Sequence, residues 1–227
     1  MPEMTRRTFE GVARRLEAVF GPWSHVDESN VWDLQDGEIS LVRVRGISGS
    51  ITVRGTSQDQ ASLRIRKVIR IPQPRAAADF ASKVRVRFKW RGRALYVRVL
   101  HPRPPLGGRV FVHLTLNVPH AVDVDLESSR GGIRVVGVEG AVQAHSRTGN
   151  IEVSDCLGSV ILNAENGGVL VHDAEGGVDI TCGRGAVRVE GVMGRVRARV
   201  NRGAFSAEDV RGQVIVRVRE GAAALRG

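Results

Sequence analysis

Arginines are the residues of this chain whose type and spacing best suit chemistry at a surface. A guanidinium group stays charged and donates paired hydrogen bonds to phosphate or carboxylate groups. Arg195, Arg197 and Arg199 occupy alternate positions, which places all three on one side of a β-strand. Together with two further arginines they form a candidate binding site for a polyanion, either nucleic acid or anionic lipid. The five residues of this site are Arg188, Arg195, Arg197, Arg199 and Arg217.

The composition offers a second explanation of the same arginines. Only three of the 34 basic residues are lysines, so arginine is the general choice for a solvated basic position. No aromatic residues are interleaved with the five arginines, so stacking of nucleic-acid bases is not indicated and nucleic acid is the less favoured ligand. The charge is also unevenly distributed, at +11 over residues 1–120, −7 over 121–180 and +6 over 181–227. We therefore expect an acidic band between two basic regions.

The acidic, histidine and cysteine residues do not form a catalytic or metal-binding pattern. Glycosidases need paired carboxylates, and no two acids stack in the outward positions three residues after each repeated glycine. Asp155 and Asp173 are 18 residues apart, but they fit a turn better than the calcium-binding G-G-x-G-x-D repeat. The six histidines share no column, and Cys156 and Cys182 form neither a CxxC motif nor a disulfide framework. The sequence predicts a protein that is not an enzyme, with no catalytic residue, cofactor or metal site.

A glycine recurs at every ninth position from residue 131 to residue 221. The residues two and four places after each glycine are apolar in every unit, so each unit is a short strand with alternate side chains facing inward. The full period is eighteen, because an extra small apolar residue occurs only in alternate units. These residues are Val138, Cys156, Ala174, Val192 and Val210. The residue before each of them is Gly or Asp, which suits a tight turn.

Such a fixed period predicts an all-β fold, a parallel β-solenoid with 18-residue coils. Each chain reversal then needs either a positive φ or a close approach of two backbones, and glycine permits both. We assign residues 31–227 to the solenoid, with irregular first coils and hairpins over 31–120 and regular coils over 121–227. Within the irregular part, residues 91–92 suggest a hairpin turn and residues 72–82 a short helical connection.

Residues 1–30 are predicted to form a short amphipathic helix and a linker. Four apolar residues of this helix fall at helical spacing and could bind the solenoid, a partner or a membrane surface: Phe9, Val12, Leu16 and Phe20. We recognise no secretory signal and no apolar run long enough to span a bilayer. The expected location is therefore the cytoplasm, with association at a membrane surface as an alternative.

The repeat resembles that of the bacterial putative-adhesin family of unknown function. The matching stretches are "GSITVRG" (49–55), "LNVPHAVDVDLESSRGGIRVVGVEG" (116–140) and "SRTGNIEVSDCLG" (146–158). They follow the family's G-x-I-x-V strand repeat and its VP step, and the similarity covers residues 31–227. The resemblance implies a parallel β-helix and no known catalytic residues.

These observations predict a structural or interaction protein, a rigid solenoid that binds a protein partner or self-associates. The last coil keeps its apolar alternation to the end of the sequence, which offers an edge for self-association formed by Val214, Val216 and Leu225. Of the oligomers, a dimer is favoured. Polyanion binding through the arginines is the alternative function. The partner, the handedness of the solenoid and the oligomeric state do not follow from the sequence.

Overall fold

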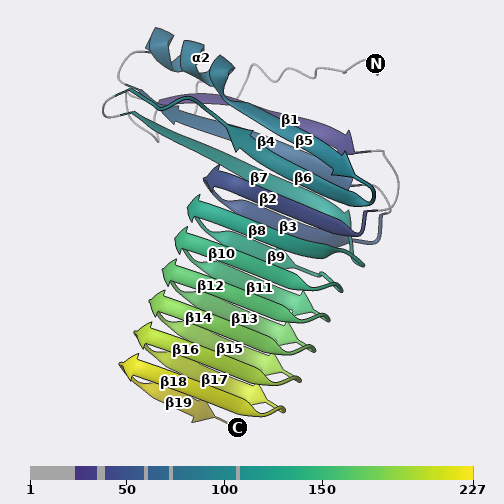
Figure 1. Ribbon diagram of the computed structural model, residues 1–227, viewed down its shortest axis with the longest axis vertical. Helices are drawn as coiled ribbons and strands as arrows, with labels where there is room; N and C mark the ends of the chain where they lie inside the picture. Colours follow the sequence, from purple (N-terminus) through teal and green to yellow (C-terminus); the bar gives the residue numbers. More distant parts are fainter. Residues whose placement is uncertain (1–23, 35–38, 59–60, 72–73, 106–107, 227) are drawn as a thin grey trace.

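Two long β-sheets stacked face to face make up the computed structural model of the protein (Figure 1). It describes residues 24–34, 39–58, 61–71, 74–105 and 108–226. Sheet A has ten strands and sheet B has nine. Strands account for 69% of the chain and the parallel solenoid makes about six turns, which confirms the all-β fold predicted from the glycine period. The helix predicted near the N-terminus, with Phe9, Val12, Leu16 and Phe20, lies outside the described residues.

The regular coils alternate between the two sheets, one strand in each. In sheet B the successive strands are β8 (Asp123–Arg130), β10 (Val142–Thr148), β12 (Val160–Asn166), β14 (Val178–Arg184), β16 (Val196–Arg202) and β18 (Val214–Glu220). In sheet A they are β9 (Ile133–Val136), β11 (Ile151–Cys156), β13 (Val169–Ala174), β15 (Val187–Val192), β17 (Phe205–Val210) and β19 (Ala223–Arg226). Each strand pairs in parallel with the strand one coil away, so that Val142 lies opposite Val160 and Ile151 opposite Val169. Paired residues on neighbouring strands of the regular coils are therefore eighteen positions apart in both sheets.

The N-terminal part continues the same two sheets with longer and partly antiparallel strands. Sheet A is extended by β3 (Ile51–Thr56), β7 (Arg109–Pro119), β4 (Ala61–Arg70) and β1 (Ser24–Leu34). Sheet B is extended by β2 (Leu41–Ser48), β6 (Ala94–Leu100) and β5 (Arg85–Arg91). Strands β5 and β6 form an antiparallel hairpin, and helix α2 (Pro74–Lys83) precedes it. The hairpin and the helix occupy the positions that the sequence indicated.

Strand β1 begins at Ser24, inside the segment that the sequence assigned to the helix and linker. It pairs antiparallel with β4, and its register shifts between Asp27 and Asn30. A shift of this kind interrupts the alternation of inward and outward side chains. The strand therefore has no regular period-two pattern that the sequence could reveal.

The core is a continuous stack of aliphatic side chains between the sheets. Val153, Val171 and Val189 are all 0% exposed, and they follow one another along sheet A. In sheet B a further inward column begins with two buried serines, and Ser146 donates a hydrogen bond to the carbonyl of Gly149 at 3.1 Å. The column of Cys156 also points inward, and that side chain is 1% exposed. The inward positions predicted from the repeat are thus buried as far as Ala207, whereas Val210 and the inward residues of the last coil are partly buried or exposed.

The glycines of the repeat meet the two requirements that the sequence left open, and alternate glycines differ in backbone conformation. Gly149 has a φ of 139°, a conformation that L residues rarely adopt, and a Cβ there would also collide with the backbone carbonyl of Gly131 in the preceding coil. Gly158 has no positive φ, but a Cβ there would collide with the backbone carbonyl of Gly140 in the preceding coil. The two sets of turns are therefore different structures, which explains why the true period is eighteen rather than nine.

Candidate functional site

The structure places four of the five predicted arginines together at the C-terminal end of sheet B. Arg197 and Arg199 are exposed on β16, and Arg195 directly precedes that strand. Arg217 is exposed on β18 and lies directly opposite Arg199. Val196, Ala198 and Val200 alternate with the arginines of β16 and point into the core, so the arginines point outward. We call Arg195, Arg197, Arg199 and Arg217 the C-terminal arginine surface.

Few carboxylates neutralise this surface. The Nε of Arg197 lies 3.9 Å from the Oδ1 of Asp179, which is a loose and exposed pair. Among the described residues, Arg199 and Arg217 have no ion pair and face each other across the two strands. Like charges directly opposite each other in a sheet repel. The arrangement concentrates positive charge where an anion can reach it.

Arg188 lies on the other sheet, away from the C-terminal arginine surface. It is exposed on β15, where its guanidinium lies 3.4 Å from Glu190 and 3.9 Å from Glu208. The sequence placed it near the others because it is close to them along the chain. Strands of one coil alternate between the sheets, so residues in neighbouring units face opposite sides. The structure does not bring Arg188 to the site.

Arg184 and Arg202 are further basic residues of sheet B, which were not among the predicted site residues. They lie opposite each other on β14 and β16, and both are exposed. Arg202 also binds Glu220 of β18 at 2.8 Å, and this hydrogen bond raises the pKa of the guanidinium and lowers the pKa of the carboxyl. The eighteen-residue spacing of these three residues could have revealed the column.

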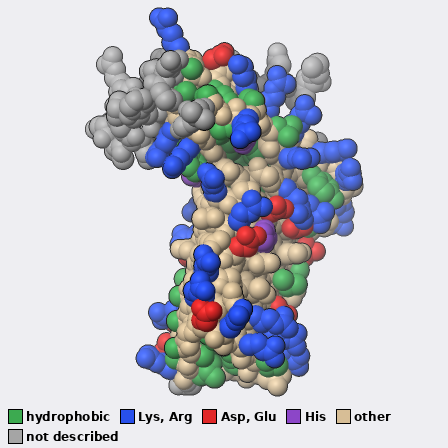
Figure 2. Space-filling model, turned by 60° about the vertical axis from the view of Figure 1, so that its left-hand side comes forward, with side chains coloured by type: hydrophobic (Ala, Val, Ile, Leu, Met, Phe, Trp, Pro, Cys, Tyr) green, Lys and Arg blue, Asp and Glu red, His purple; other side chains and the backbone are tan. Residues whose placement is uncertain are grey.

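In Figure 2, basic side chains gather near both ends of the stack on the face in view, with acidic side chains and histidine among them in the middle.

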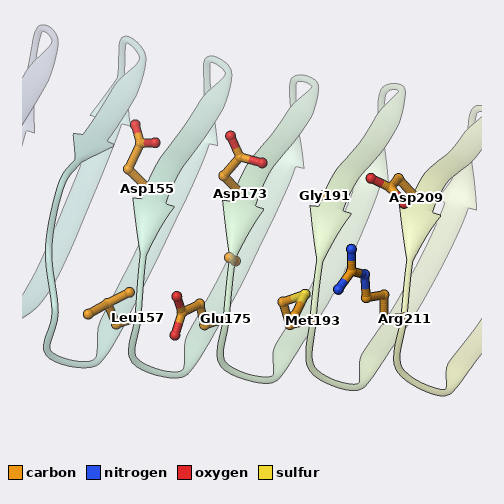
Figure 3. A pocket seen from close by; sticks show the side chains of 9 residues that line it. Asp155, Leu157, Asp173, Glu175, Gly191, Met193, Asp209 and Arg211 are labelled. Carbon is orange, nitrogen blue, oxygen red and sulfur yellow. The ribbon is translucent and has the colours of Figure 1, made fainter.

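An open groove of about 440 Å³ runs along one turn edge of the regular coils (Figure 3). Two rows of residues at equivalent positions of successive coils line it. One row is Asp155, Asp173, Gly191 and Asp209, and the other is Leu157, Glu175, Met193 and Arg211. The three aspartates have φ values of 50° to 55°, so they form the tight turns expected from the sequence. At Gly191 a Cβ would collide with the carboxylate of Asp173.

The groove does not assemble its carboxylates around one point. Its aspartates follow one another from coil to coil, and the Oδ2 of Asp173 lies 2.9 Å from the Nε2 of the adjacent His172. Within the described part of the chain, no group of three His, Cys, Asp or Glu side chains could hold a metal ion. Cys156 and Cys182 are buried, and burial raises the pKa of both thiols, which disfavours the reactive thiolate. Turn formation accounts for the aspartates.

The predicted self-association edge lies in the last coil. Val214 and Val216 of β18 are half-buried, whereas the equivalent residues one coil earlier, Val196 and Ala198, are at most 1% exposed. Leu225 of β19 is 62% exposed. Within the described residues, β18 and β19 each have a neighbouring strand on one side only. The coil therefore leaves apolar side chains and a row of backbone groups uncovered.

Comparisons with known proteins identify the fold. The structure is similar to that of a putative adhesin from Bacteroides fragilis, with a TM-score of 0.52, 11% sequence identity, and 88% of this chain and 96% of that chain covered. A putative cell adhesion protein from Clostridium sporogenes has a TM-score of 0.44 at 9% identity, with 88% of this chain and 98% of that chain covered. A putative lipid binding protein from Parabacteroides distasonis has a TM-score of 0.34 at 10% identity, with 86% and 96% covered. No protein-family model and no curated protein matches the sequence.

The similarity to the Bacteroides fragilis protein confirms, at the level of fold, the resemblance to the putative adhesins that the G-x-I-x-V repeat indicated. Because the sequence identity is only 11%, this similarity shows the fold alone. In the described residues no helix has the length and hydropathy needed to cross a bilayer.

Proposed function

We propose that the protein is a non-catalytic binding scaffold, a rigid solenoid that presents its surfaces to a partner or to a second copy of itself. The observation that carries this proposal is the closed core. Its aliphatic column runs from coil to coil between the two sheets, and among the described residues the groove at the turn edge is open to solvent rather than enclosed. Binding surfaces are therefore the sheet faces and the last coil.

The last coil supports self-association as a dimer. A second copy related by a two-fold axis would place the exposed Leu225 and the half-buried Val216 of each copy against the same residues of the other. The opposite end of the stack is bounded by β1, β5 and α2, so it does not present a matching parallel coil for a head-to-tail contact. A closed dimer is for this reason the expected assembly.

Light scattering over a wide range of protein concentration tests the dimer. We expect the wild-type mass to approach that of two chains as concentration rises, at both low and high salt, because apolar contacts are not screened. Leu225→Asp should remain a monomer, since it places a charge in the contact. Ile161→Asp is the matched control, because Ile161 is 49% exposed on the outer face of β12, an interior strand of sheet B. A monomeric wild type at every concentration would exclude self-association.

The C-terminal arginine surface supports a second function, the binding of a polyanion. The specific observation is that Arg199 and Arg217 lie directly opposite each other without an ion pair among the described residues. Binding to phosphates weakens as a power of salt concentration, and that power is smaller when fewer arginines bind phosphate. The double variant Arg199→Gln/Arg217→Gln should therefore bind polyanions more weakly and with a smaller salt dependence. Equal binding by wild type and variant would remove this function.

A further inference from the structure

A second basic surface lies at the other end of sheet B, on the hairpin of β5 and β6. Strand β5 alternates half-buried Val86, Phe88 and Trp90 with exposed basic residues. Four of these basic side chains are on β5 and one is on β6. We call them the N-terminal basic surface: Arg85, Arg87, Lys89, Arg91 and Arg98.

The cations of the N-terminal basic surface are not balanced by neighbouring acids. Among the described residues none of the five forms an ion pair, and Arg87 lies directly opposite Arg98. Two acids on β8 of the same sheet, Asp125 and Glu127, already have partners. Asp125 lies 2.7 Å from Arg43 and 3.0 Å from Arg45, and Glu127 lies 2.7 Å from Arg45.

Protection of a sheet edge explains only part of this charge. Edge strands often carry Lys or Arg to prevent pairing with another chain, and β5 is an edge strand. Strand β6, however, pairs with β5 on one side and β2 on the other. Arg98 therefore protects no edge, and its position opposite Arg87 favours binding of an anion over protection.

Both basic surfaces face the same way. Strands β5, β6 and β2 continue the order of β8 to β18 within one nine-stranded sheet, and the inward positions of β6 and β16 belong to the same core. Arg98 on β6 and Arg199 on β16 are separated by six strand spacings, or ~29 Å at ~4.8 Å per strand. A single extended ligand that contacts both surfaces must therefore be flat or straight over this distance.

The outer face of sheet B between the two surfaces is suited to a planar ligand. Of its exposed acids, Asp179 lies 3.9 Å from Arg197, Glu165 lies 3.4 Å from His145, and Asp123 accepts a hydrogen bond from the backbone N–H of Ala141. Ile161 on this face is 49% exposed. Cations flanking exposed aliphatic side chains match the interface of an anionic bilayer, where apolar groups enter the headgroup region and Arg binds lipid phosphate.

The same face is less suited to single-stranded nucleic acid. Tyr96 is its aromatic residue on β6, and the guanidinium groups of Arg43 and Arg91 each lie 5.5 Å from the centre of that ring. The two guanidinium groups therefore compete with a base for the faces of this ring. Phe88 and Trp90 are packed against the core.

We propose that the outer face of sheet B docks on an anionic lipid bilayer through the N-terminal basic surface and the C-terminal arginine surface together. This inference rests on the polyanion binding proposed above and specifies both its ligand and a second contact region. Both ends of one rigid sheet meet the membrane plane at once, so each end raises the effective concentration of the other at the surface.

Binding of the full chain to vesicles tests this inference. The vesicles are phosphatidylcholine alone, or phosphatidylcholine and phosphatidylglycerol in a two-to-one ratio. Three double variants each remove two exposed arginines: Arg87→Gln/Arg98→Gln at the N-terminal end, Arg199→Gln/Arg217→Gln at the C-terminal end, and Arg54→Gln/Arg64→Gln on sheet A as the control. Arg54 and Arg64 are exposed on β3 and β4 and have no ion pair among the described residues.

We expect the wild type to bind the anionic vesicles and not the neutral ones. A cation near an anionic surface contributes about fivefold to partitioning, so each sheet B double variant should bind roughly thirtyfold more weakly. The control should bind within a fewfold of the wild type. Thermal melting checks folding, and the N-terminal variant should be at least as stable as the wild type because it removes the Arg87–Arg98 repulsion.

The possible failures are distinguishable. If the N-terminal variant binds anionic vesicles like the wild type, this inference is wrong while the C-terminal arginine surface remains. If duplex DNA binds more tightly than anionic vesicles at equal salt, the lipid assignment is wrong while polyanion binding stands. If the wild type binds neither, the proposed polyanion function fails as well.

Discussion

Arg199 and Arg217 lie directly opposite each other on neighbouring parallel strands, and both side chains are exposed on the outer face of sheet B. Two like charges in this position destabilise the sheet. The neighbouring column shows the alternative, because Arg202 lies opposite Glu220 and binds it at 2.8 Å. The chain thus places a repulsive pair and an attractive pair side by side on the same two strands.

Replacing Arg217 with Glu should change stability and polyanion binding in opposite directions. The substitution creates an ion pair with Arg199, which we expect to raise the free energy of unfolding by a few tenths of a kcal/mol. It also removes one cation and adds one anion at the C-terminal arginine surface, so binding to anionic vesicles should fall. Chemical denaturation and vesicle binding of the same preparation measure both effects. A variant that loses stability would contradict the assigned register.

The inward column of sheet A should not tolerate a charge. Val171 is 0% exposed, and Val171→Asp places a carboxylate among aliphatic side chains without a partner. We expect a loss of at least about 3 kcal/mol in the free energy of unfolding. The adjacent Leu170 is 36% exposed on the outer face, so Leu170→Asp is the matched control and should cost less than about 1 kcal/mol. Equal thermal melts for the two variants would invalidate the assignment of inward and outward faces.

Two glycines separate the cost of a steric collision from the cost of a positive φ. Gly158→Ala places a Cβ against the carbonyl of Gly140, and the stacked coils must shift, so we expect a loss of about 2–3 kcal/mol. Gly92, in the β5–β6 turn, has a φ of 57°, and no other residue comes within 4 Å of the position that a Cβ would occupy. Gly92→Ala should therefore cost only about 1 kcal/mol, the penalty of the left-handed conformation. Denaturant unfolding of the two variants gives the comparison, and a larger loss at Gly92 would contradict it.

His113 should make the fold less stable in mild acid. Its Nδ1 accepts a hydrogen bond from the backbone N–H of Ser50 at 3.2 Å, and burial, with a smaller contribution from the charge of Arg66, lowers the pKa of the imidazole. The unfolded chain, with a histidine pKa of about 6.5, then binds more protons than the folded chain. The contribution of neutral His113 to the free energy of unfolding is complete above the unfolded pKa of about 6.5. It is lost as the pH falls from there through the lower pKa of the folded state.

Unfolding free energies measured from neutral pH downward should therefore decline in the wild type below a pH of about 6.5. His113→Gln cannot be protonated, so it should be less sensitive over the same range, even if it is less stable overall. The same dependence in wild type and variant would show that His113 does not contribute.

The regular coils could be predicted from the sequence because each inward position repeats the same physical requirement. Val135, Val153, Val171 and Val189 lie side by side in register on neighbouring strands, so an error of one residue would bury charged side chains such as Arg134, Glu152 and Arg188. The hairpin of β5 and β6 was also recognisable from its alternation and its glycine turn. Strand β1 was not, because its register shift removes the period on which such a prediction depends.

The candidate site was predicted less completely than the fold. Alternation placed Arg195, Arg197 and Arg199 on one side of a strand, and they lie together in the structure. Arg188 does not lie with them, because neighbouring nine-residue units belong to opposite sheets. The N-terminal basic surface was missed since its position on sheet B depends on the pairing of β6 with β2, between residues more than fifty apart in the sequence. Long-range pairing of irregular strands leaves no periodic signal.

The division of each coil between two sheets restricts how the length of this chain can change. Removal of eighteen residues, such as 159–176, would join β11 to β14 at equivalent positions and preserve both sheets. Removal of nine, such as 159–167, would instead join two strands of the same sheet, β11 and β13, and the two kinds of turn are not interchangeable. Insertions and deletions in the regular part are therefore tolerated in whole coils. Each coil gained or removed changes the distance between the two basic ends of sheet B by ~4.8 Å, so relatives of different length would present the same two charged regions at graded separations.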